Sequence, residues 1–434
     1  EPGAGYVAAA AAAVERGMPP AGPEQLLSRI PPQIRNDPTI SPHVNRLRGL
    51  IDRITIVVPG TPQPFDENGG GGMLGGSEEA VVYLTRALAL KGRNVRVFGV
   101  LPPHRLPGPD RYGVDWRNVT DFKPDDENGT VVLWRAPGVL LNLMREAAKQ
   151  NRTFAGVLQA FLWLHDSGLG VPENTLSALS TGCRGAVILS DFHARMITRA
   201  GFTGKLFKAS NGIVEDDFVD YIDEGGFGFS GFPQARDPFN VVYSSCPSRG
   251  LVPLLKMWPS VKAAVPQAKL DIFYDWSMLE QMQPKKFEEV MQAYEAVKHL
   301  DVLHHGGVDH ATLHTALRRA NLWAYSHFES PEVETFCISA VKALAAGATV
   351  LTVPNGALEE VTAGDAYFAR STEEYCEKLI YFLKQPEGVE PRRRRARRAL
   401  ERYGWASVAD GFSALWSVRT LLEGKSASVT KEAA

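Results

Sequence analysis

The sequence predicts an α/β protein with two doubly wound parallel sheets that face each other across a linker. Short apolar segments typical of buried parallel strands alternate with amphipathic helical segments along most of the chain. The alternation is interrupted at residues 221–238, which are rich in Gly, Phe and Pro and are expected to form the linker. Because ligands of such sheets bind at the carboxyl ends of the strands, two facing sheets imply one interdomain cleft.

The composition is that of a globular protein of two or three domains. The 434 residues are 44% hydrophobic and 22% charged, which is enough to bury a sizeable core. With 47 Lys and Arg against 49 Asp and Glu, the net charge of −2 provides no global field to hold nucleic acid. The four cysteines show no C-x-x-C spacing, which argues against a disulfide framework or a zinc site and favours a cytoplasmic location.

Residues 1–50 are rich in Ala, Pro and Arg and are expected to form an extension outside the main fold. We interpret the Ala-rich tract as a helix rather than a signal peptide, because Glu15 and Arg16 follow it closely. The chain begins at Glu1 rather than at an initiator Met, which suggests that it belongs to a larger polypeptide.

The first domain is expected at residues 51–220. The β-branched run at 54–58 ends in Pro-Gly and predicts a buried strand, and a Gly-rich loop then leads into a helix at 77–91. This order of strand, loop and helix, followed by another strand, is typical of a parallel sheet. The further strands are expected at 95–100, 131–134, 157–164 and 186–190.

The second domain is expected at residues 239–399. Its helices are predicted at 251–265, 311–320 and 335–346, between the strands. A final helical stretch runs from about 392 to 422, and its part from about 400 is expected to pack back on the first domain. The predicted strands of the second domain are 239–243, 270–274, 302–303, 322–325, 349–353 and 366–369.

The Gly-rich loop at 69–76 is the first candidate site, because it follows a strand and opens a helix. Backbone N–H groups at a helix N-terminus attract anions and hydroxyl-rich ligands. The spacing matches neither a phosphate-binding loop with its Lys nor a dinucleotide-binding G-x-G-x-x-G loop. The alternative is a plain turn with Ser77 as the N-cap of the helix.

Further candidates stand at the ends of other predicted strands. Arg249 lies where a helix begins, and an Arg beside a positive helix terminus can hold a diphosphate. Glu334 precedes the helix predicted at 335–346, where it either binds a ligand or caps the helix. His165 follows an apolar strand, where it either faces the ligand or is a structural hydrogen-bond partner. Asn211-Gly212 by itself indicates only a turn.

Seven motifs follow one another along the chain: Gly75-Gly76-Ser77-Glu78-Glu79-Ala80-Val81, His165-Asp166, Asn211-Gly212-Ile213, Arg249-Gly250-Leu251, His305-Gly306, the helix after Glu334, and residues 354–361. In this order they resemble the motifs of the glycosyltransferases of family four, which have the GT-B fold of two Rossmann-like domains. The resemblance runs from about residue 53 to about residue 420, and it depends on the order and spacing of motifs that are each weak alone.

The resemblance implies a retaining hexosyltransferase that uses a nucleotide-diphosphate sugar. The hexose would pass to a hydroxyl of a glycan or other acceptor, with the acceptor on the side of the first domain and the donor on the second. No metal ion or other cofactor is expected, because Arg249 and helix N-termini can neutralise the leaving diphosphate, a task that a divalent metal performs elsewhere.

The same resemblance implies the roles of individual residues. His165 would lie over the hexose, Arg249 would hold the diphosphate and Glu334 would bind hexose hydroxyls, so these three are the expected catalytic residues. The expected donor-binding residues are Gly75, Gly76, Asn211, Gly212, Ser245, Arg249, Gly250, His305, Gly306, Glu334, Thr335, Phe336, Cys337, Ile338 and Lys342.

Lys342 departs from the family pattern. The family often has two Glu in an E-x₇-E arrangement, the second of which holds the nucleotide ribose, and Lys342 occupies that second position. A Lys cannot accept hydrogen bonds from ribose hydroxyls, although it can face a phosphate or another carboxylate. This substitution motivates an alternative, a catalytically silent module that binds a nucleotide or sugar. A dinucleotide-dependent oxidoreductase is a further alternative, against which the absent G-x-G-x-x-G motif argues.

Arginines at 392–395 and 397–398 form a local basic cluster. It is either a solvated helix face or a peripheral contact with anionic lipid or an anionic glycan. The longest apolar run, at 157–164, is too short to span a bilayer, so any membrane association is expected to be peripheral.

Overall fold

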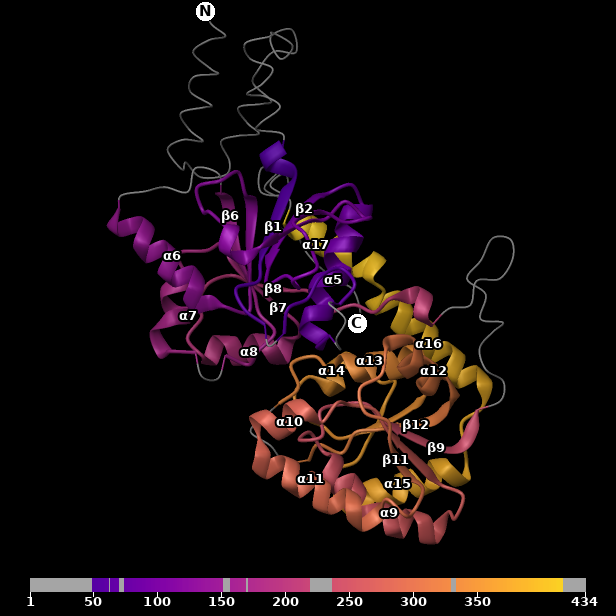
Figure 1. Ribbon diagram of the computed structural model, residues 1–434. Helices are drawn as coiled ribbons and strands as arrows, with labels where there is room; N and C mark the ends of the chain where they lie inside the picture. The colour runs from indigo at the N-terminus through magenta and orange to yellow at the C-terminus, as the bar shows by residue number, and fades with distance from the viewer. Residues whose placement is uncertain are drawn as a thin grey trace, which may run out of the picture. The chain divides into compact units, whose positions relative to one another are not determined.

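The computed structural model describes residues 49–61, 63–69, 74–150, 157–168, 171–218, 236–328 and 333–416. The chain divides into two compact units: the first comprises residues up to Ser210 together with those from Val408 onward, and the second comprises Asn211–Ser407 (Figure 1). The expected extension lies outside the described residues except for its last two positions, and the expected linker lies outside them up to residue 235.

The first unit contains an eight-stranded sheet in the order β3-β4-β2-β1-β5-β6-β7-β8. Its neighbouring strands are parallel, except for the antiparallel pair of β3 and β4. The strands are β1 (Arg53–Val57), β2 (Asn94–Gly99), β3 (Gly108–Pro109), β4 (Asp115–Asn118), β5 (Gly129–Trp134), β6 (Val157–Trp163), β7 (Gly185–Ile188) and β8 (Leu206–Lys208).

Helices cover both faces of this sheet. Figure 1 shows α6 and α7 on one face and α5 on the other. On the first of these faces, buried residues such as Val57, Leu133 and Leu162 form one core cluster with the apolar sides of the helices. Burial on both faces explains why the central strands are apolar at nearly every position. The helices are α5 (Gly76–Leu90), α6 (Pro137–Lys149), α7 (Glu173–Leu179) and α8 (Asp191–Arg199).

The second unit contains a six-stranded sheet in the order β11-β10-β9-β12-β13-β14, in which every neighbouring pair is parallel. The strands are β9 (Asp237–Tyr243), β10 (Lys269–Ile272), β11 (Val302–His304), β12 (Ala320–Ala324), β13 (Thr349–Thr352) and β14 (Tyr367–Phe368). Figure 1 shows α9, α11 and α15 on one face of this sheet and α12, α13 and α16 on the other. The helices are α9 (Leu251–Ala264), α10 (Ser277–Met282), α11 (Pro284–Val297), α12 (His310–Arg319), α13 (Ile338–Ala345), α14 (Leu358–Thr362), α15 (Thr372–Lys384) and α16 (Val389–Tyr403).

The chain returns to the first unit through α17 (Trp405–Leu415). Phe412 and Trp416 pack edge-on against the buried Trp163, with ring centroids 5.4 and 5.8 Å away. The hydroxyl of Thr130 and the amide of Gln159 donate hydrogen bonds to the Trp416 carbonyl, at 3.1 and 3.3 Å. The end of α17 is therefore part of the core of the first unit.

The predicted fold class is confirmed, since both sheets are parallel apart from one edge strand and helices lie on both faces. The sequence did not indicate β3, β4 and β8, which are strands of only two to four residues toward the two edges of the sheet. The C-terminal stretch that was expected to be helical from about residue 392 forms two helices, and its residues after 416 lie outside the described part of the chain. Gly404 separates α16 from α17, where the N–H groups of Ile213 and Trp405 donate to the carbonyls of Tyr403 and Ile213, at 2.7 and 3.0 Å.

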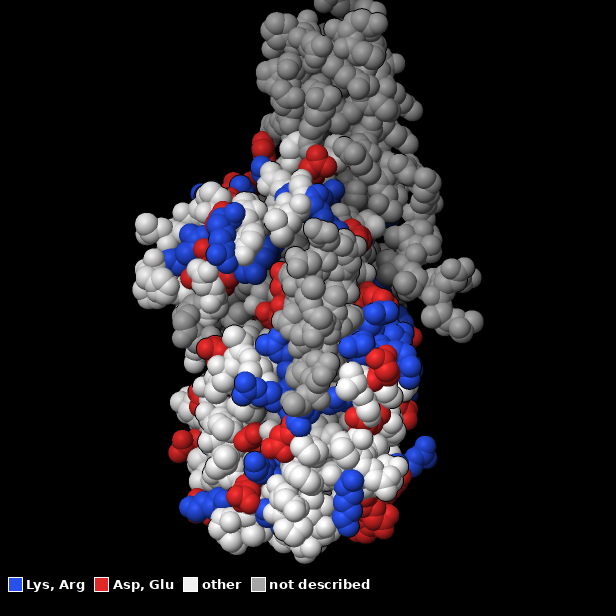
Figure 2. Space-filling model, turned by 90° about the vertical axis from the view of Figure 1, so that its right-hand side faces the viewer, with Lys and Arg blue, Asp and Glu red and all other residues white. Residues whose placement is uncertain are grey.

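Two expectations concern the surface of the protein: a basic cluster at residues 392–398, and a membrane association that would be peripheral. Arg392 and Arg395 of the basic cluster are buried rather than solvated, and Arg395 pairs with Glu387 at 2.8 Å. On the face drawn in Figure 2, Lys and Arg side chains lie among Asp and Glu side chains rather than forming a single-signed surface. Within the described part of the chain, no helix has both the length and the apolar character needed to cross a membrane.

Candidate functional site

Arg249 lies in the tight turn between β9 and α9. The Tyr243 hydroxyl donates to the carbonyls of Cys246 and Arg249, at 2.7 and 2.8 Å, and the Arg249 N–H donates to the Cys246 carbonyl at 2.8 Å. The next residue, Gly250, has a φ of 88°, and a Cβ there would lie 2.5 Å from the backbone nitrogen of His327. Residue 250 must therefore be glycine, both because of its positive φ and because a Cβ would not fit there. The turn holds Arg249 in the segment that follows the carboxyl end of β9.

Glu334 is buried in the segment that precedes α13. Its N–H donates to Oδ1 of Asn355 at 3.1 Å, and its carbonyl accepts from the N–H of Ala357 at 2.8 Å. Gly356, between them, has a φ of 61°, and a Cβ there would overlap the backbone of Glu334. The backbone of Glu334 is thus fixed by the loop that follows β13.

The structure brings Arg249 and Glu334 together. Nη1 of Arg249 lies 3.2 Å from Oε1 of Glu334, although the two residues are 85 positions apart in the chain. The Tyr325 hydroxyl donates to the same carboxylate oxygen. Burial and the charge of Glu334 raise the pKa of Tyr325 well above its ordinary value, so the hydroxyl stays neutral and can donate. The pair offers a carboxylate that can accept hydrogen bonds from hydroxyls beside a guanidinium that can hold an anion.

The start of α13 differs from the prediction. The helix begins at Ile338 rather than at 335, because Cys337 adopts a left-handed conformation with a φ of 66°. Thr335 and Phe336 therefore belong to the loop, where Phe336 packs edge-on against Tyr403 with ring centroids 5.5 Å apart. The first N–H groups of a helix lack intrahelical acceptors, so this terminus, which begins four residues after Glu334, is suited to bind an anionic or hydroxyl-rich group.

Lys342 lies in the middle of α13 and is buried. Nearby, Oδ2 of Asp217 in the short 3-10 helix Glu215–Asp217 lies 3.1 Å from Nδ1 of His314 on α12. Burial would raise the pKa of Asp217, but the hydrogen bond from His314 and the charges of His314, His310 and Lys342 lower it. Lys342 thus contributes to a cationic environment around a carboxylate.

Other expected donor-binding residues occupy defined places in the second unit. His305, at the end of β11, stacks on Phe273 with ring centroids 4.5 Å apart, and its Nε2 lies 2.7 Å from Oδ1 of Asp271. Gly306 has a φ of 71°, and Ser245 lies just before Arg249 in the turn after β9. The buried Asn211 precedes Gly212, where a Cβ would overlap the Trp405 ring, so close packing against α17 explains that glycine.

In the first unit, Gly75 and Gly76 form the start of α5, while residues 70–73 of the Gly-rich loop lie outside the described residues. Gly75, not Ser77, is the N-cap, so the interpretation of Ser77 as a cap is wrong. The Ser77 hydroxyl instead donates to Oε2 of Glu78 at 3.0 Å and accepts from Nη1 of Arg135 at 3.0 Å.

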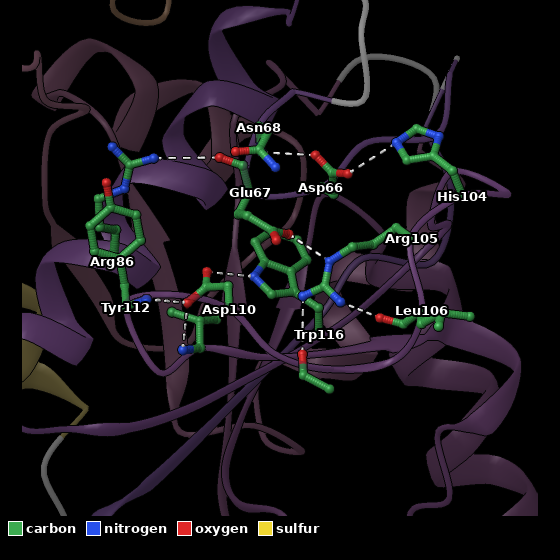
Figure 3. A network of polar contacts seen from close by, with 12 residues as sticks. Asp66, Glu67, Asn68, Arg86, His104, Arg105, Leu106, Asp110, Tyr112 and Trp116 are labelled. Atoms are coloured by element: carbon green, nitrogen blue, oxygen red, sulfur yellow. Dashed lines mark hydrogen bonds and ion pairs between the residues drawn. The ribbon is translucent and has the colours of Figure 1, made fainter.

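A polar network holds the segment that leads into the Gly-rich loop (Figure 3). The buried Asp66 accepts from the N–H of Asn68 at 2.8 Å and lies 3.7 Å from Nε2 of His104. Glu67 pairs with Nε of Arg105 at 2.9 Å. The start of the loop is therefore tied to the segment that follows β2, as Figure 3 shows.

His165 is buried at the end of β6, between two tryptophans. Its ring centroid lies 4.9 Å from that of Trp163 and 5.9 Å from that of Trp134. Burial, and then the charges of Arg135 and His193, hold the pKa of His165 well below its ordinary value. His165 is therefore a neutral imidazole at pH 7, able to donate or accept a hydrogen bond.

Arg135, which directly follows β5, is a site residue that the sequence did not indicate. It contacts Asp166 at 2.7 and 2.8 Å and Ser77 at 3.0 Å, so it joins two segments that carry predicted site residues. The position of Arg135 directly after an apolar strand is the signal that could have revealed it, because ligands of parallel sheets bind at the carboxyl ends of the strands. The same position made His165 a candidate. Within the described ranges, no three His, Cys, Asp or Glu side chains gather as they would to hold a metal ion.

The comparisons with known proteins agree with this architecture. Residues 241–402 match the family Glycosyl transferases group 1, and no curated protein sequence matches the chain. Trehalose-6-phosphate synthase OtsA has a similar structure, with a TM-score of 0.62 and 10% identity over 84% of this chain and 98% of that one. Sucrose-phosphate synthase from Thermosynechococcus elongatus gives a TM-score of 0.61 and 14% identity over 86% and 100% of the two chains.

A third solved structure is AviGT4, a glycosyltransferase involved in avilamycin A biosynthesis. Its TM-score is 0.57 and its identity 15%, over 86% of this chain and 98% of that one. Similarities at such identities establish the shared fold, and the family match lies in the unit that carries Arg249 and Glu334. The chain thus has the two-domain GT-B fold of these solved structures, and its residues 241–402 match the glycosyl transferases group 1.

Proposed function

We propose that the protein transfers a hexose from a nucleoside-diphosphate sugar to a hydroxyl of a glycan or other acceptor, with retention of anomeric configuration and without a metal ion. The observation that carries the proposal is the Arg249–Glu334 pair beside the start of α13, within the residues that match the glycosyl transferases group 1. The donor is assigned to the second unit and the acceptor to the first, as the sequence resemblance implies.

The chemistry of the pair suits such a donor. Glu334 would accept hydrogen bonds from the hexose hydroxyls, since its carboxylate is held by Tyr325 and its backbone is fixed on both sides. Arg249 would bind the diphosphate, together with the open N–H groups at the start of α13. These positive groups would stabilise the negative charge that develops on the leaving diphosphate, which is the largest electrostatic demand of the reaction.

Retention without a covalent glycosyl–enzyme intermediate requires the acceptor to attack from the face that the diphosphate leaves. We propose that a donor phosphate oxygen removes the proton of the acceptor hydroxyl on that face. His165 is neutral because of its burial, so it would serve as a hydrogen-bonding partner of the hexose rather than as a cation. The protein would then contribute binding, orientation and electrostatic stabilisation rather than a covalent nucleophile.

The test has two stages. Thermal-shift measurements with UDP, GDP, ADP and dTDP identify the nucleotide, because a ligand that binds the folded state raises its apparent stability. Transfer and donor hydrolysis are then measured with the matching nucleotide sugars in the presence of EDTA, and NMR of the product gives the anomeric configuration. Full activity in EDTA with a retained anomer is the expected result, and an inverted product or a strict metal requirement would contradict the proposal.

Lys342 supports a second candidate, a module that binds the nucleotide or sugar without turnover. The residue is buried near Asp217, and it stands where the resemblance places a carboxylate for the ribose. Stabilisation by one nucleotide, with neither transfer nor hydrolysis of any matching sugar donor, would favour this candidate over the enzyme.

A further inference from the structure

Arg135 joins three segments of the first unit. Its guanidinium donates from Nε and Nη2 to the two carboxylate oxygens of Asp166, at 2.7 and 2.8 Å, and from Nη1 to the Ser77 hydroxyl at 3.0 Å. The same Nη1 lies 3.6 Å from Oε1 of Glu78. One side chain at the end of β5 therefore contacts the first turn of α5 and the segment after β6.

The backbone of Arg135 has an uncommon conformation for a residue with a side chain. Its φ is 56°, in the left-handed region that disfavours a Cβ. Its N–H donates to the carbonyl of Trp163 at 2.9 Å, and its guanidinium carbon lies 5.0 Å from the centroid of the Trp134 ring. Strand pairing and ring packing thus hold Arg135 where a glycine would fit more readily, and such positions cluster at functional sites.

Asp166 is held from its backbone as well. Nδ1 of His193 accepts a hydrogen bond from the N–H of Leu189 at 3.2 Å, so the proton of this neutral ring lies on Nε2. Nε2 then donates to the Asp166 carbonyl at 2.8 Å. Arg135 and His193 together fix both the side chain and the peptide of Asp166, and this determines where the preceding residue, His165, is placed.

We infer that Arg135 is a positioning residue for the transfer reaction, which aligns His165 with the start of α5 through its contacts to Asp166 and Ser77. The inference rests on the proposed function, in which His165 and the Gly75-Gly76 turn serve the same reaction. Arginine is required because its planar fork can satisfy both oxygens of Asp166 while a further N–H reaches Ser77, and a lysine ammonium cannot reproduce this geometry.

Steady-state kinetics of the full chain test this inference. Arg135→Ala and Arg135→Lys should each lower kcat by about 10- to 100-fold, with a much smaller change in the donor KM, because misalignment affects the reacting geometry more than binding. Arg135→Gly relieves the left-handed backbone, so it should show the same loss of kcat even if it is more stable than Arg135→Ala. Arg145→Ala, at an exposed Arg of α6 in the same unit, is the matched control and should leave kcat unchanged.

A double-mutant cycle with Asp166→Asn sharpens the test. If the two residues act through one contact, Arg135→Ala combined with Asp166→Asn should be no slower than the worse single variant. If the loss of kcat in the double variant equals the product of the two single losses, the two residues act independently and the coupling is refuted. Wild-type kcat in Arg135→Lys or Arg135→Gly would overturn the positioning role, whether or not Arg135→Ala folds.

A spectroscopic readout separates this inference from the proposed function. The ring signals of His165, in protein with labelled histidine, can be assigned from a His165→Gln variant. They should shift in the Arg135 variants and stay unchanged in Arg145→Ala. If no donor is turned over but these shifts occur, the proposed function fails while the positioning of His165 by Arg135 stands. If transfer occurs and the signals and kcat stay unchanged in all Arg135 variants, the inference fails while the function stands.

Discussion

Each unit places an arginine beside a carboxylate in the segments that follow the carboxyl ends of two adjacent strands, but the two pairs differ in geometry. In the first unit, Arg135 donates two hydrogen bonds to Asp166, at 2.7 and 2.8 Å. In the second, Arg249 makes one contact of 3.2 Å with Glu334. A bidentate pair fixes the orientation of both partners, whereas a single longer contact is more readily exchanged for a ligand.

The burial of the two pairs is reversed. The Asp166 side chain is 56% exposed and that of Arg135 32%, while Glu334 is 7% exposed and Arg249 41%. The pair in the second unit therefore presents its cation to solvent and keeps its carboxylate inside, which suits a site that receives an anion first. Two similar residue pairs thus differ in which partner is exposed, which fits the proposed roles of Arg135 as a positioning residue and of Arg249 with Glu334 as a binding site.

Glu334→Gln should break the second pair with the largest effect on activity. The substitution keeps the shape of the side chain but removes its charge, so we expect kcat/KM to fall by about 100- to 1000-fold with the fold intact. Kinetics with the preferred nucleotide sugar give the loss. Glu377→Gln, at an exposed position of α15, is the control, and equal activity of the two variants would remove Glu334 from the site.

Arg249→Ala should have the next largest effect. Loss of charge-assisted hydrogen bonds to a diphosphate costs about 2–3 kcal/mol, which corresponds to roughly a 100-fold loss in kcat/KM. The thermal shift produced by the free nucleoside diphosphate should shrink as well, which distinguishes Arg249 from the Arg135 scaffold. A normal nucleotide shift in Arg249→Ala would contradict a diphosphate contact.

Gly356→Ala should test the rigid support of Glu334. A Cβ at this residue, whose φ is 61°, would overlap the backbone of Glu334, so we expect the free energy of unfolding to fall by about 1–3 kcal/mol. Urea unfolding measures the change. Gly411→Ala in α17, where a Cβ would meet no atom within 4 Å, should be neutral or stabilising by up to about 1 kcal/mol. Equal unfolding midpoints for the two variants would refute the strain argument.

The two units should respond to acid at different pH values. Burial of His165 lowers its pKa, so the unfolded chain binds a proton that the folded chain does not, and stability should fall as the pH drops below about 6.5. One proton contributes at most about 1.4 kcal/mol per pH unit. The pKa of Asp217 is also lowered in the folded state. Its protonation should therefore reduce the stability of the fold only when the pH falls below 3.8, the ordinary pKa of Asp. Urea midpoints against pH for the wild type and His165→Gln measure the first contribution, and identical profiles would contradict it.

The sequence was sufficient for features that neighbouring residues encode. The apolar, β-branched run at 54–58 and the run ending at Tyr243 predicted buried strands, because parallel strands covered on both faces must be apolar at most positions. It also predicted the helix that begins at residue 251, directly after Gly250 with its positive φ. It failed at the start of α13, since the left-handed conformation of Cys337 is imposed by its surroundings and not by its residue type.

The fold class and the order of the candidate motifs could thus be predicted from the amino-acid sequence, because periodicity and turn residues act over a few neighbouring positions. The contacts between distant side chains could not. Arg249 reaches Glu334 because β9 and β12 are adjacent in the sheet, and Arg135 reaches Asp166 because β5 and β6 are. Such contacts depend on strand order and on the packing of helices across the sheet, and these come from burial of the whole core rather than from any local segment.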